Sequence, residues 1–286
     1  MTARTYLNLG LGIIIVTLVL VVIYEPGIEK PREPQKLSQL TVNEIKHISV
    51  EKDDKVSIVL DKLNDGWHIS QPYQMPANEF RVQSLLQLTI EKSYAQYPAN
   101  EHDLKKFKLD KPQIRVHLGD LTVSFGDTEP LTLHRYVLAN NTIHLVDDNI
   151  YHQVIRNAVS FISNDLLPND KEIVALATEN FQLHRKDTDK PWVITPAAST
   201  ASADTINELL DEWRHAQALD VQTYVGEKPA QKVSIKFNKG DTIQFDILSK
   251  QPELVLGRAD IGIEYHLTGD SYKKLFELRK PEQVSE

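Results

Sequence analysis

A run of 18 residues without a charged side chain, from Leu7 to Tyr24, constrains this chain more than any other feature. Thirteen of the 18 are Leu, Ile or Val, and a helix of that length covers about 27 Å at 1.5 Å per residue. Insertion free energies of the aliphatic residues sum to roughly −4 to −8 kcal/mol. The sequence therefore predicts one N-terminal transmembrane helix over residues 7–24.

Two other interpretations of this run stay open. A buried core helix is one, although a soluble helix of five turns ordinarily carries a polar face. A cleaved signal peptide is the other, but signal peptidase reads small residues before its cleavage site and the run ends in Val21, Val22, Ile23 and Tyr24. We therefore expect an uncleaved signal anchor.

The charges around the run predict its orientation. Residues 1–6 contain Arg4 and no acid, whereas residues 25–36 hold three acids and three bases. Because basic residues favour the cytoplasmic side, residues 1–6 are expected to be a cytoplasmic leader. The bulk of the chain would then lie in the periplasm of a bacterium, tethered to the inner membrane by a single pass. Pro26, Pro31 and Pro34 predict an extended spacer over residues 25–39.

Charge and cysteine content exclude several classes of function. Forty acidic against 32 basic residues give a formal charge of −8, which disfavours nucleic acid as a partner. The chain has no cysteine, so disulfides, thiol catalysis, thiolate-bound metals and a lipid-modified N-terminal cysteine are excluded. We expect no cofactor.

Residues 40–286 contain what reads as two copies of one unit. Trp67-His68-Ile69-Ser70-Gln71-Pro72 is matched about 125 residues later by Trp192-Val193-Ile194-Thr195-Pro196. Each Trp motif is followed by an amphipathic helical pattern, with Phe80, Val82, Leu85 and Leu86 in the first copy and Ile206, Leu209, Leu210 and Trp213 in the second. We interpret the recurrence as a duplication, with chance similarity of two domains as the alternative.

Strand patterns complete each copy. Alternating runs at 113–118 and 121–125 match runs at 232–237 and 242–245, and a strand with His144 or His266 leads into a short terminal helix. Each unit is thus predicted as a hairpin or three-stranded meander, one helix, four further strands and a last helix. The expected fold class is α+β with antiparallel sheets, as a first repeat over 40–165 and a second over 166–286.

The short motifs that could indicate chemistry are weak. Ser271-Tyr272-Lys273-Lys274 fits a Ser-x-x-Lys pattern, but its companion motifs are missing. Asp187 and Asp189 resemble a fragment of a metal site and also read as a solvated turn. We predict no catalytic, cofactor-binding or metal-binding residue.

The histidines and tryptophans favour structural roles. His144 and His266 fall at equivalent repeat positions, which indicates a structural function at a strand end. Trp67 and Trp192 are also equivalent, and we expect both to be largely buried core anchors.

Several motifs together are similar to a known bacterial envelope family. They are the two Trp-x-Ile motifs, the Leu-Leu helix, Leu109-Asp110-Lys111-Pro112, Phe125-Gly126 and Tyr136-Val137-Leu138. The chain resembles the family catalogued as domain of unknown function 4340 over most of residues 40–278. The second copy departs from the pattern with Asp246 in place of Gly126. The resemblance implies one N-terminal anchoring helix, and likeness to a region of the auxiliary proteins of gliding-motility-type ABC transporters.

Three functions follow as hypotheses. The first is a non-enzymatic, membrane-anchored periplasmic accessory subunit that binds permease or auxiliary subunits of an ABC-type transport complex. The second is an envelope hydrolase acting on glycan or peptidoglycan through a carboxylate pair. The third is a module that binds a small amphiphile or glycan in a groove between the repeats. A broad apolar patch would favour a protein partner, and a deep cleft with convergent carboxylates an enzyme.

Overall fold

The computed structural model describes residues 3–24, 35–196, 201–226 and 231–278, and in the first helix it describes the side chains of residues 8–20. The chain forms two compact units, Met1–Gln35 and Lys36–Glu286. We call residues 36–157 the first lobe, residues 158–170 the connecting segment and residues 171–278 the second lobe. The predicted boundary between residues 165 and 166 falls inside the connecting segment, and the two-domain division stays a prediction.

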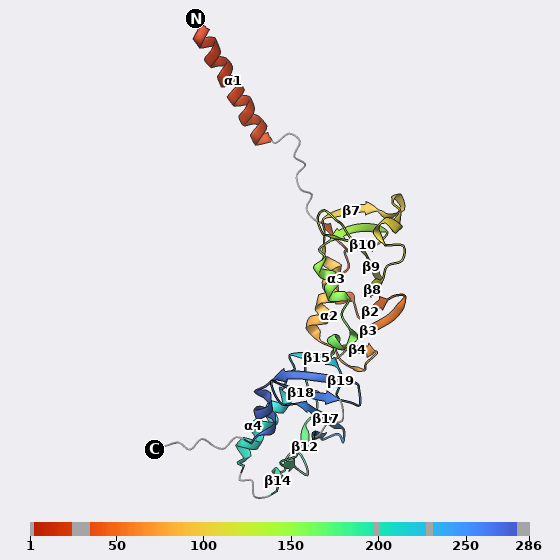
Figure 1. Cartoon of the computed structure of the whole chain (residues 1–286), viewed down its shortest axis with the longest axis vertical. Coiled ribbons are helices and arrows are strands. Elements are labelled where there is room, and N and C mark those ends of the chain that lie inside the picture. Colours follow the sequence, from red (N-terminus) through yellow and green to blue (C-terminus); the bar gives the residue numbers. More distant parts are fainter. Residues whose placement is uncertain (1–2, 25–34, 197–200, 227–230, 279–286) are drawn as a thin grey trace. The chain divides into compact units, whose positions relative to one another are not determined.

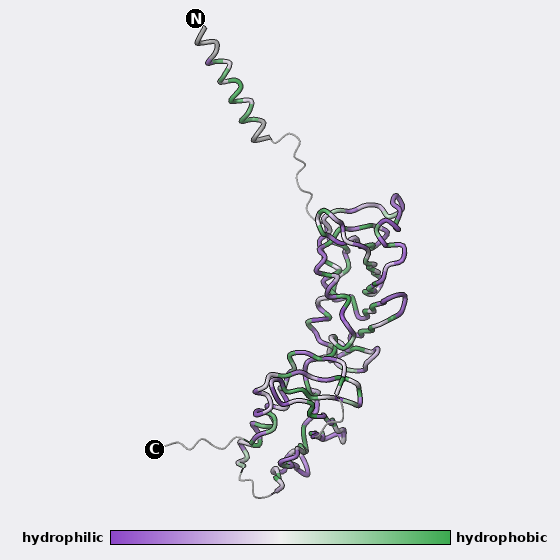
Figure 2. Tube along the Cα trace, in the orientation of Figure 1, coloured by the Kyte–Doolittle hydropathy of each residue, from purple (hydrophilic) through white to green (hydrophobic). Residues whose placement is uncertain are grey.

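The N-terminal unit contains the helix α1 (Ala3–Tyr24), which includes the whole predicted run and begins four residues before it. Its aliphatic side chains between Leu9 and Leu20 are each half exposed or more, and Figure 2 shows the apolar colouring of its middle turns. In the part of the chain that is described, no helix combines the length and apolar character needed to cross a membrane. Most of the predicted spacer, residues 25–34, lies outside the described residues.

Two short strands and a large antiparallel sheet build the first lobe (Figure 1). β1 (Gln35–Lys36) pairs with β6 (Lys92–Ser93). The strands of the sheet are β2 (His47–Lys52), β3 (Lys55–Leu63), β4 (Gly66–Gln71), β5 (Met75–Pro76), β7 (Ala95–Pro98), β8 (Ile114–Leu118), β9 (Leu121–Thr128), β10 (Arg135–Ala139) and β11 (Thr142–Val146). Their order is β5-β4-β3-β2-β8-β9-β10-β11-β7.

The second lobe has a sheet of eight antiparallel strands. They are β12 (Ile173–Ala177), β13 (Gln182–His184), β14 (Val193–Thr195), β15 (Asp220–Thr223), β16 (Gln231–Phe237), β17 (Thr242–Ser249), β18 (Glu253–Arg258) and β19 (Ile263–Thr268). Their order is β14-β13-β12-β16-β17-β18-β19-β15. If β5 is set aside, the strands of the first sheet follow the same order as their counterparts in the second, with β4 matching β14 and β7 matching β15. The predicted α+β class with antiparallel sheets is confirmed.

Both lobes have strands that the sequence did not predict, and in the first lobe these include the two-residue strands β1, β5 and β6. The longer additions are β7 and β15, which follow the main helix of each lobe and pair at an edge of its sheet. Both are four residues long and mostly exposed, so they lack the alternation of apolar and polar residues by which a strand is recognised in sequence.

Helices cover one face of each sheet. α2 (Glu79–Leu86) contacts α3 (Asn149–Val154), and α4 (Ala203–Arg214) contacts α5 (Ser271–Phe276). Short 3₁₀ helices lie at η1 (Val42–Glu44), η2 (Gln87–Ile90), η3 (Ala99–Glu101), η4 (Leu104–Phe107) and η5 (Ala158–Phe161).

The two main helices bury the side chains that the helical period predicted, with one exception. Val82, Leu85 and Leu86 of α2 are buried, as are Ile206, Leu209, Leu210 and Trp213 of α4. The indole Nε1 of Trp213 donates to Leu275 O at 2.7 Å, which ties α4 to α5. Phe80 was predicted on the buried face, but it lies in the first turn of α2 and is 73% exposed.

The outer faces of the two sheets differ in polarity. In the first lobe Phe107 and Leu109 pack over Gly126, where a Cβ atom would overlap the carbonyl oxygen of Phe107. At the matching place in the second lobe, Asp246 is buried and accepts a hydrogen bond from Tyr224 Oη at 3.0 Å. The departure of the second copy from the family pattern is thus a buried polar pair in place of an apolar contact.

Candidate functional site

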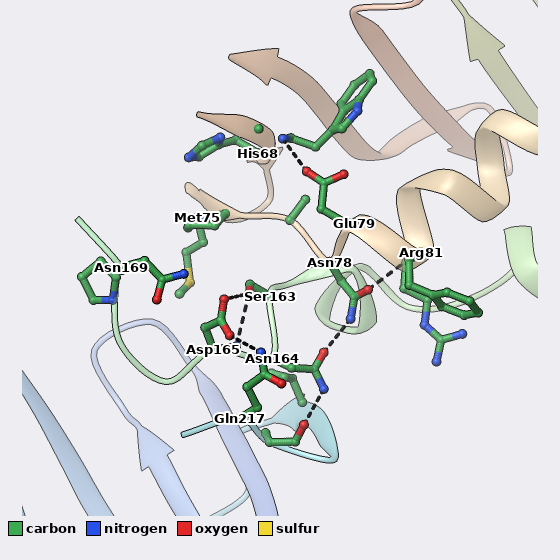
Figure 3. Close-up of a pocket in the computed structure, with 18 of the residues that line it drawn as sticks. His68, Met75, Asn78, Glu79, Arg81, Ser163, Asn164, Asp165, Asn169 and Gln217 are labelled. Atoms are coloured by element: carbon green, nitrogen blue, oxygen red, sulfur yellow. Dashed lines mark hydrogen bonds between the residues drawn. The ribbon is translucent and has the colours of Figure 1, made fainter. Parts of the chain in front are cut away.

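A groove of about 660 Å³ lies where the first lobe, the connecting segment and the second lobe meet (Figure 3). Its walls come from the turn between β3 and β4, from β5 and the first turn of α2, from residues 160–170 and from residues 217–221. We call it the interlobe groove. Its position is that of the groove between repeats on which the third hypothesis depends.

Asn78 links the main helix of the first lobe to the connecting segment. It is the N-cap of α2, with extended backbone angles, and its Oδ1 accepts from the Arg81 amide at 3.2 Å. Its Nδ2 donates to Asn164 Oδ1 at 2.5 Å, and Asn164 Nδ2 donates to Ala218 O at 2.7 Å. Figure 3 shows this chain of amides running from one lobe to the other.

Backbone hydrogen bonds reinforce the same link. On one side of the connecting segment, Asn78 N donates to Phe161 O at 2.8 Å and Ser163 N donates to Pro76 O at 2.9 Å. On the other side, Ala218 N donates to Asn164 O at 2.8 Å. The connecting segment therefore forms backbone hydrogen bonds to both lobes, as a strand would. These bonds hold the part of the groove lining that the segment supplies.

Two carboxylates of the groove are held in structural bonds. Glu79 Oε1 accepts from the Trp67 amide at 3.2 Å, close to Gly66, whose φ of +129° suits glycine. Asp165 Oδ1 accepts from Gln217 Nε2 at 2.8 Å, and its Oδ2 accepts from Ser163 Oγ at 3.2 Å. These groups position the walls, and both oxygens of Asp165 and one oxygen of Glu79 already accept hydrogen bonds.

The lining of the groove is acidic. Five carboxylate side chains face one guanidinium, the carboxylates being Asp65, Glu79, Asp165, Asp170 and Asp220. The guanidinium is that of Arg81, whose pKa is lowered by desolvation and by the positive charge of Arg156, while Asp220 raises it. Two of the carboxylates have partners, since Asp170 lies 3.9 Å from Lys239 Nζ and Asp65 lies 3.6 Å from His68 Nε2. Carboxylates still outnumber cations, and a negative concave site attracts cations.

Two large apolar side chains stand exposed at this acidic groove. Phe80 and Leu219, which are 73% and 67% exposed, both line it, one at the start of α2 and the other just before β15. Apolar side chains at a concave site are available to act as anchors for a bound segment.

The weak motifs of the sequence do not come together in the groove. Ser271 and Lys274 lie in α5, and Asp187 and Asp189 lie in the bend after β13. Over the described residues, no three His, Asp or Glu side chains are arranged to hold a metal ion.

The predicted equivalence of His144 and His266 is wrong. His144 lies opposite Val137 on the core face of its sheet, is buried, and contacts Ser93 Oγ at 3.0 Å. In the second lobe the core residue of β19 is Tyr265, and His266 lies on the outer face between Glu253 and Glu264. Successive strand residues point to opposite faces, so a shift of one residue between the copies exchanges the sides.

The two tryptophans of the repeated motif also differ. Trp67 lies within β4 and is 3% exposed, as predicted. Trp192 precedes β14 and is only half-buried, with the guanidinium of Arg185 at 4.8 Å from its ring centroid. The expectation of two buried core residues is therefore confirmed for Trp67, and Trp192 is partly buried and packs against the core.

Only part of the groove could be recognised from the sequence. An Asn-Glu pair before an apolar helical period is recognisable as a helix start, but the pairing of Asn78 with Asn164 joins positions 86 residues apart. The connecting segment is short and mixes buried apolar with polar residues, and its bonding to both lobes arises only in the fold.

These features define a two-lobed antiparallel α+β protein with an acidic groove at the junction of its lobes. The chain belongs to the family described as domain of unknown function (DUF4340), whose model matches residues 67–247. The match starts at Trp67, beside the groove, and ends within β17, so it includes the junction. No curated protein and no solved structure matches the chain significantly.

Proposed function

We propose that the protein is a membrane-anchored accessory subunit that binds a partner protein through the interlobe groove. The partner segment that fits is cationic and carries an apolar side chain. The observation that carries this proposal is the composition of the groove, with five carboxylates against one guanidinium and with Phe80 and Leu219 exposed. Apolar anchors supply most of the affinity of such a contact, and complementary charge supplies rate and specificity.

Four of the polar groups in the groove have structural roles. The side chains of Asn78, Asn164 and Asp165 form hydrogen bonds that link the first lobe, the connecting segment and the second lobe. Glu79 accepts a hydrogen bond from the Trp67 amide. A general acid or base needs an oxygen free to meet the substrate. In this groove the most restrained oxygens hold the two lobes together.

The remaining parts of the proposal rest on the sequence. The run Leu7–Tyr24 supports an uncleaved anchor in the bacterial inner membrane, with the larger unit in the periplasm. The family resemblance supports an ABC-type transport complex as the assembly. The equal strand order of the two sheets supports an origin of the lobes by duplication of one unit.

The test is recovery of the complex from detergent-solubilised membranes with the full-length chain. Asp65 and Asp220 are exposed groove residues, and Asp65→Lys with Asp220→Lys should abolish co-purification of the partner. Asp110→Lys with Asp120→Lys makes the same charge change on exposed residues away from the groove and should leave recovery intact.

Two outcomes would contradict the proposal. One is equal recovery of the partner with both double variants. The other is turnover of glycan or peptidoglycan by the full-length protein, which would assign the carboxylates to catalysis.

A further inference from the structure

A second cavity, of about 370 Å³, opens in the second lobe at the ends of β12 and β13 and beside the turn between β16 and β17. Four of its lining residues are basic in type, His184, Arg185, Lys186 and Lys236, and one is acidic, Asp187. The whole chain has a net charge of −8. The basic lining of this cavity therefore differs from the acidic character of the chain as a whole.

The strand register forms the cavity. Ala175 of β12 lies opposite His184 of β13 on one side and opposite Lys236 of β16 on the other. Directly opposed residues point to the same face of a sheet. The small side chain of Ala175 therefore lies between two longer basic ones, and the hollow between them results from that difference in size.

Arg185 supplies a donor without an acceptor. Its guanidinium lies 4.8 Å from the centroid of the Trp192 ring, and its Nη1 and Nη2 donate to Thr188 O at 2.7 Å and Ile173 O at 3.1 Å. The side chain is 11% exposed, and Nε is buried without a hydrogen-bond partner in the described structure. A buried N–H without an acceptor is unfavourable, and such groups often mark the place of an ion.

The two lysines of the cavity are uncompensated. Across the described ranges, neither Lys186 nor Lys236 forms an ion pair, whereas Lys171 and Lys239 nearby are paired with Asp241 and Asp170. Arg185 Nη2 lies 3.5 Å from Glu172 Oε2, and Asp187 lines the cavity, so two carboxylates stand against the Arg185 guanidinium and the two ammonium groups. Positive charge is thus left over at this cavity.

We propose that this cavity binds a phosphoryl group. A phosphoryl group carries several acceptor oxygens and up to two negative charges, which suits two unpaired ammonium groups beside a guanidinium better than a single carboxylate does. The guanidinium is already fixed by its carbonyl acceptors and by Trp192, so binding orders little besides the two lysines. The same chemistry is present in inorganic phosphate and in a phospholipid headgroup.

The test is calorimetric titration of the full-length protein, in non-ionic detergent at constant ionic strength, with two probes. The probes are inorganic phosphate and glycerophosphoglycerol, the water-soluble diester headgroup of phosphatidylglycerol. Binding of at least one probe is expected, and Lys186→Ala with Lys236→Ala should weaken it about tenfold or more. Binding of the diester alone assigns a lipid headgroup, and binding of phosphate alone assigns the free ion.

A matched control separates the site from general charge. Lys105→Ala with Lys106→Ala removes two exposed lysines from η4 of the first lobe and should leave the affinity unchanged. Absence of binding by both probes overturns the proposal. So does equal weakening by the two double variants, because the effect would then depend on net charge alone.

Discussion

Replacing Asn164 by alanine removes the side chain that joins the two lobes. Its Oδ1 accepts from Asn78 Nδ2 at 2.5 Å and its Nδ2 donates to Ala218 O at 2.7 Å. Two neutral hydrogen bonds contribute about 0.5–1.5 kcal/mol each, so Asn164→Ala should lower the free energy of unfolding by about 1–3 kcal/mol. For a unit of this size that is a fall in melting temperature of roughly 2–4 °C per kcal/mol.

The assay is urea unfolding of the full-length chain followed by tryptophan fluorescence. Trp67 and Trp213 are buried in different lobes and report on both. Asn169→Ala is the matched control, since Asn169 is an exposed asparagine of the same groove. A double-mutant cycle of Asn78→Ala with Asn164→Ala should give a coupling of about 1 kcal/mol. An Asn164→Ala protein as stable as Asn169→Ala would refute the role assigned to this amide chain.

Three further predictions concern stability. Trp213→Ala should lower the free energy of unfolding in urea by about 3–5 kcal/mol, because Trp213 is fully buried. Trp192→Ala should lower it clearly less, because Trp192 is only partly buried. Equal losses of stability in the two variants would contradict this prediction. Gly126→Ala should lower the free energy of unfolding by about 1–3 kcal/mol, because the added Cβ overlaps the carbonyl oxygen of Phe107. An unchanged urea midpoint would contradict this prediction. Burial lowers the pKa of His144 from its ordinary 6.5. The unfolded chain therefore binds more protons, and stability should fall as the pH drops below about 6.5, more steeply in the wild type than in His144→Gln; identical pH profiles would oppose this.

Much of the fold could be read from the sequence because local patterns determine it. The helical period places Leu85 and Leu209 in the cores of their lobes, and both are buried. The turns at Gly66 and Gly240 follow the local preference of glycine, with the positive φ values, +129° and +91°, that tight turns require. These features depend on residues close in the chain, which is why pattern and propensity suffice.

The sequence-based predictions fail where contacts between distant parts of the chain determine the position of a side chain. Phe80 fits the apolar period of α2, yet it falls in the first turn, where the helix reaches the groove and no partner element covers it. A one-residue shift reversed the sides of His144 and His266, and sequence similarity alone cannot detect such a shift. The groove itself depends on Asn164 meeting both Asn78 and Ala218, contacts that only the tertiary structure creates.

Site-specific photo-cross-linking in intact cells shows whether the partner protein binds at the interlobe groove. A photoreactive phenylalanine analogue is placed in the full-length chain at Phe80, at Leu219 or at Leu131, which is 90% exposed in the first lobe and away from the groove. The account predicts that positions 80 and 219 cross-link one and the same protein, and that Asp65→Lys with Asp220→Lys removes both products while position 131 gives none. Cross-links from position 131 alone, or products from positions 80 and 219 that persist after charge reversal, would contradict the interlobe groove as the partner-binding site.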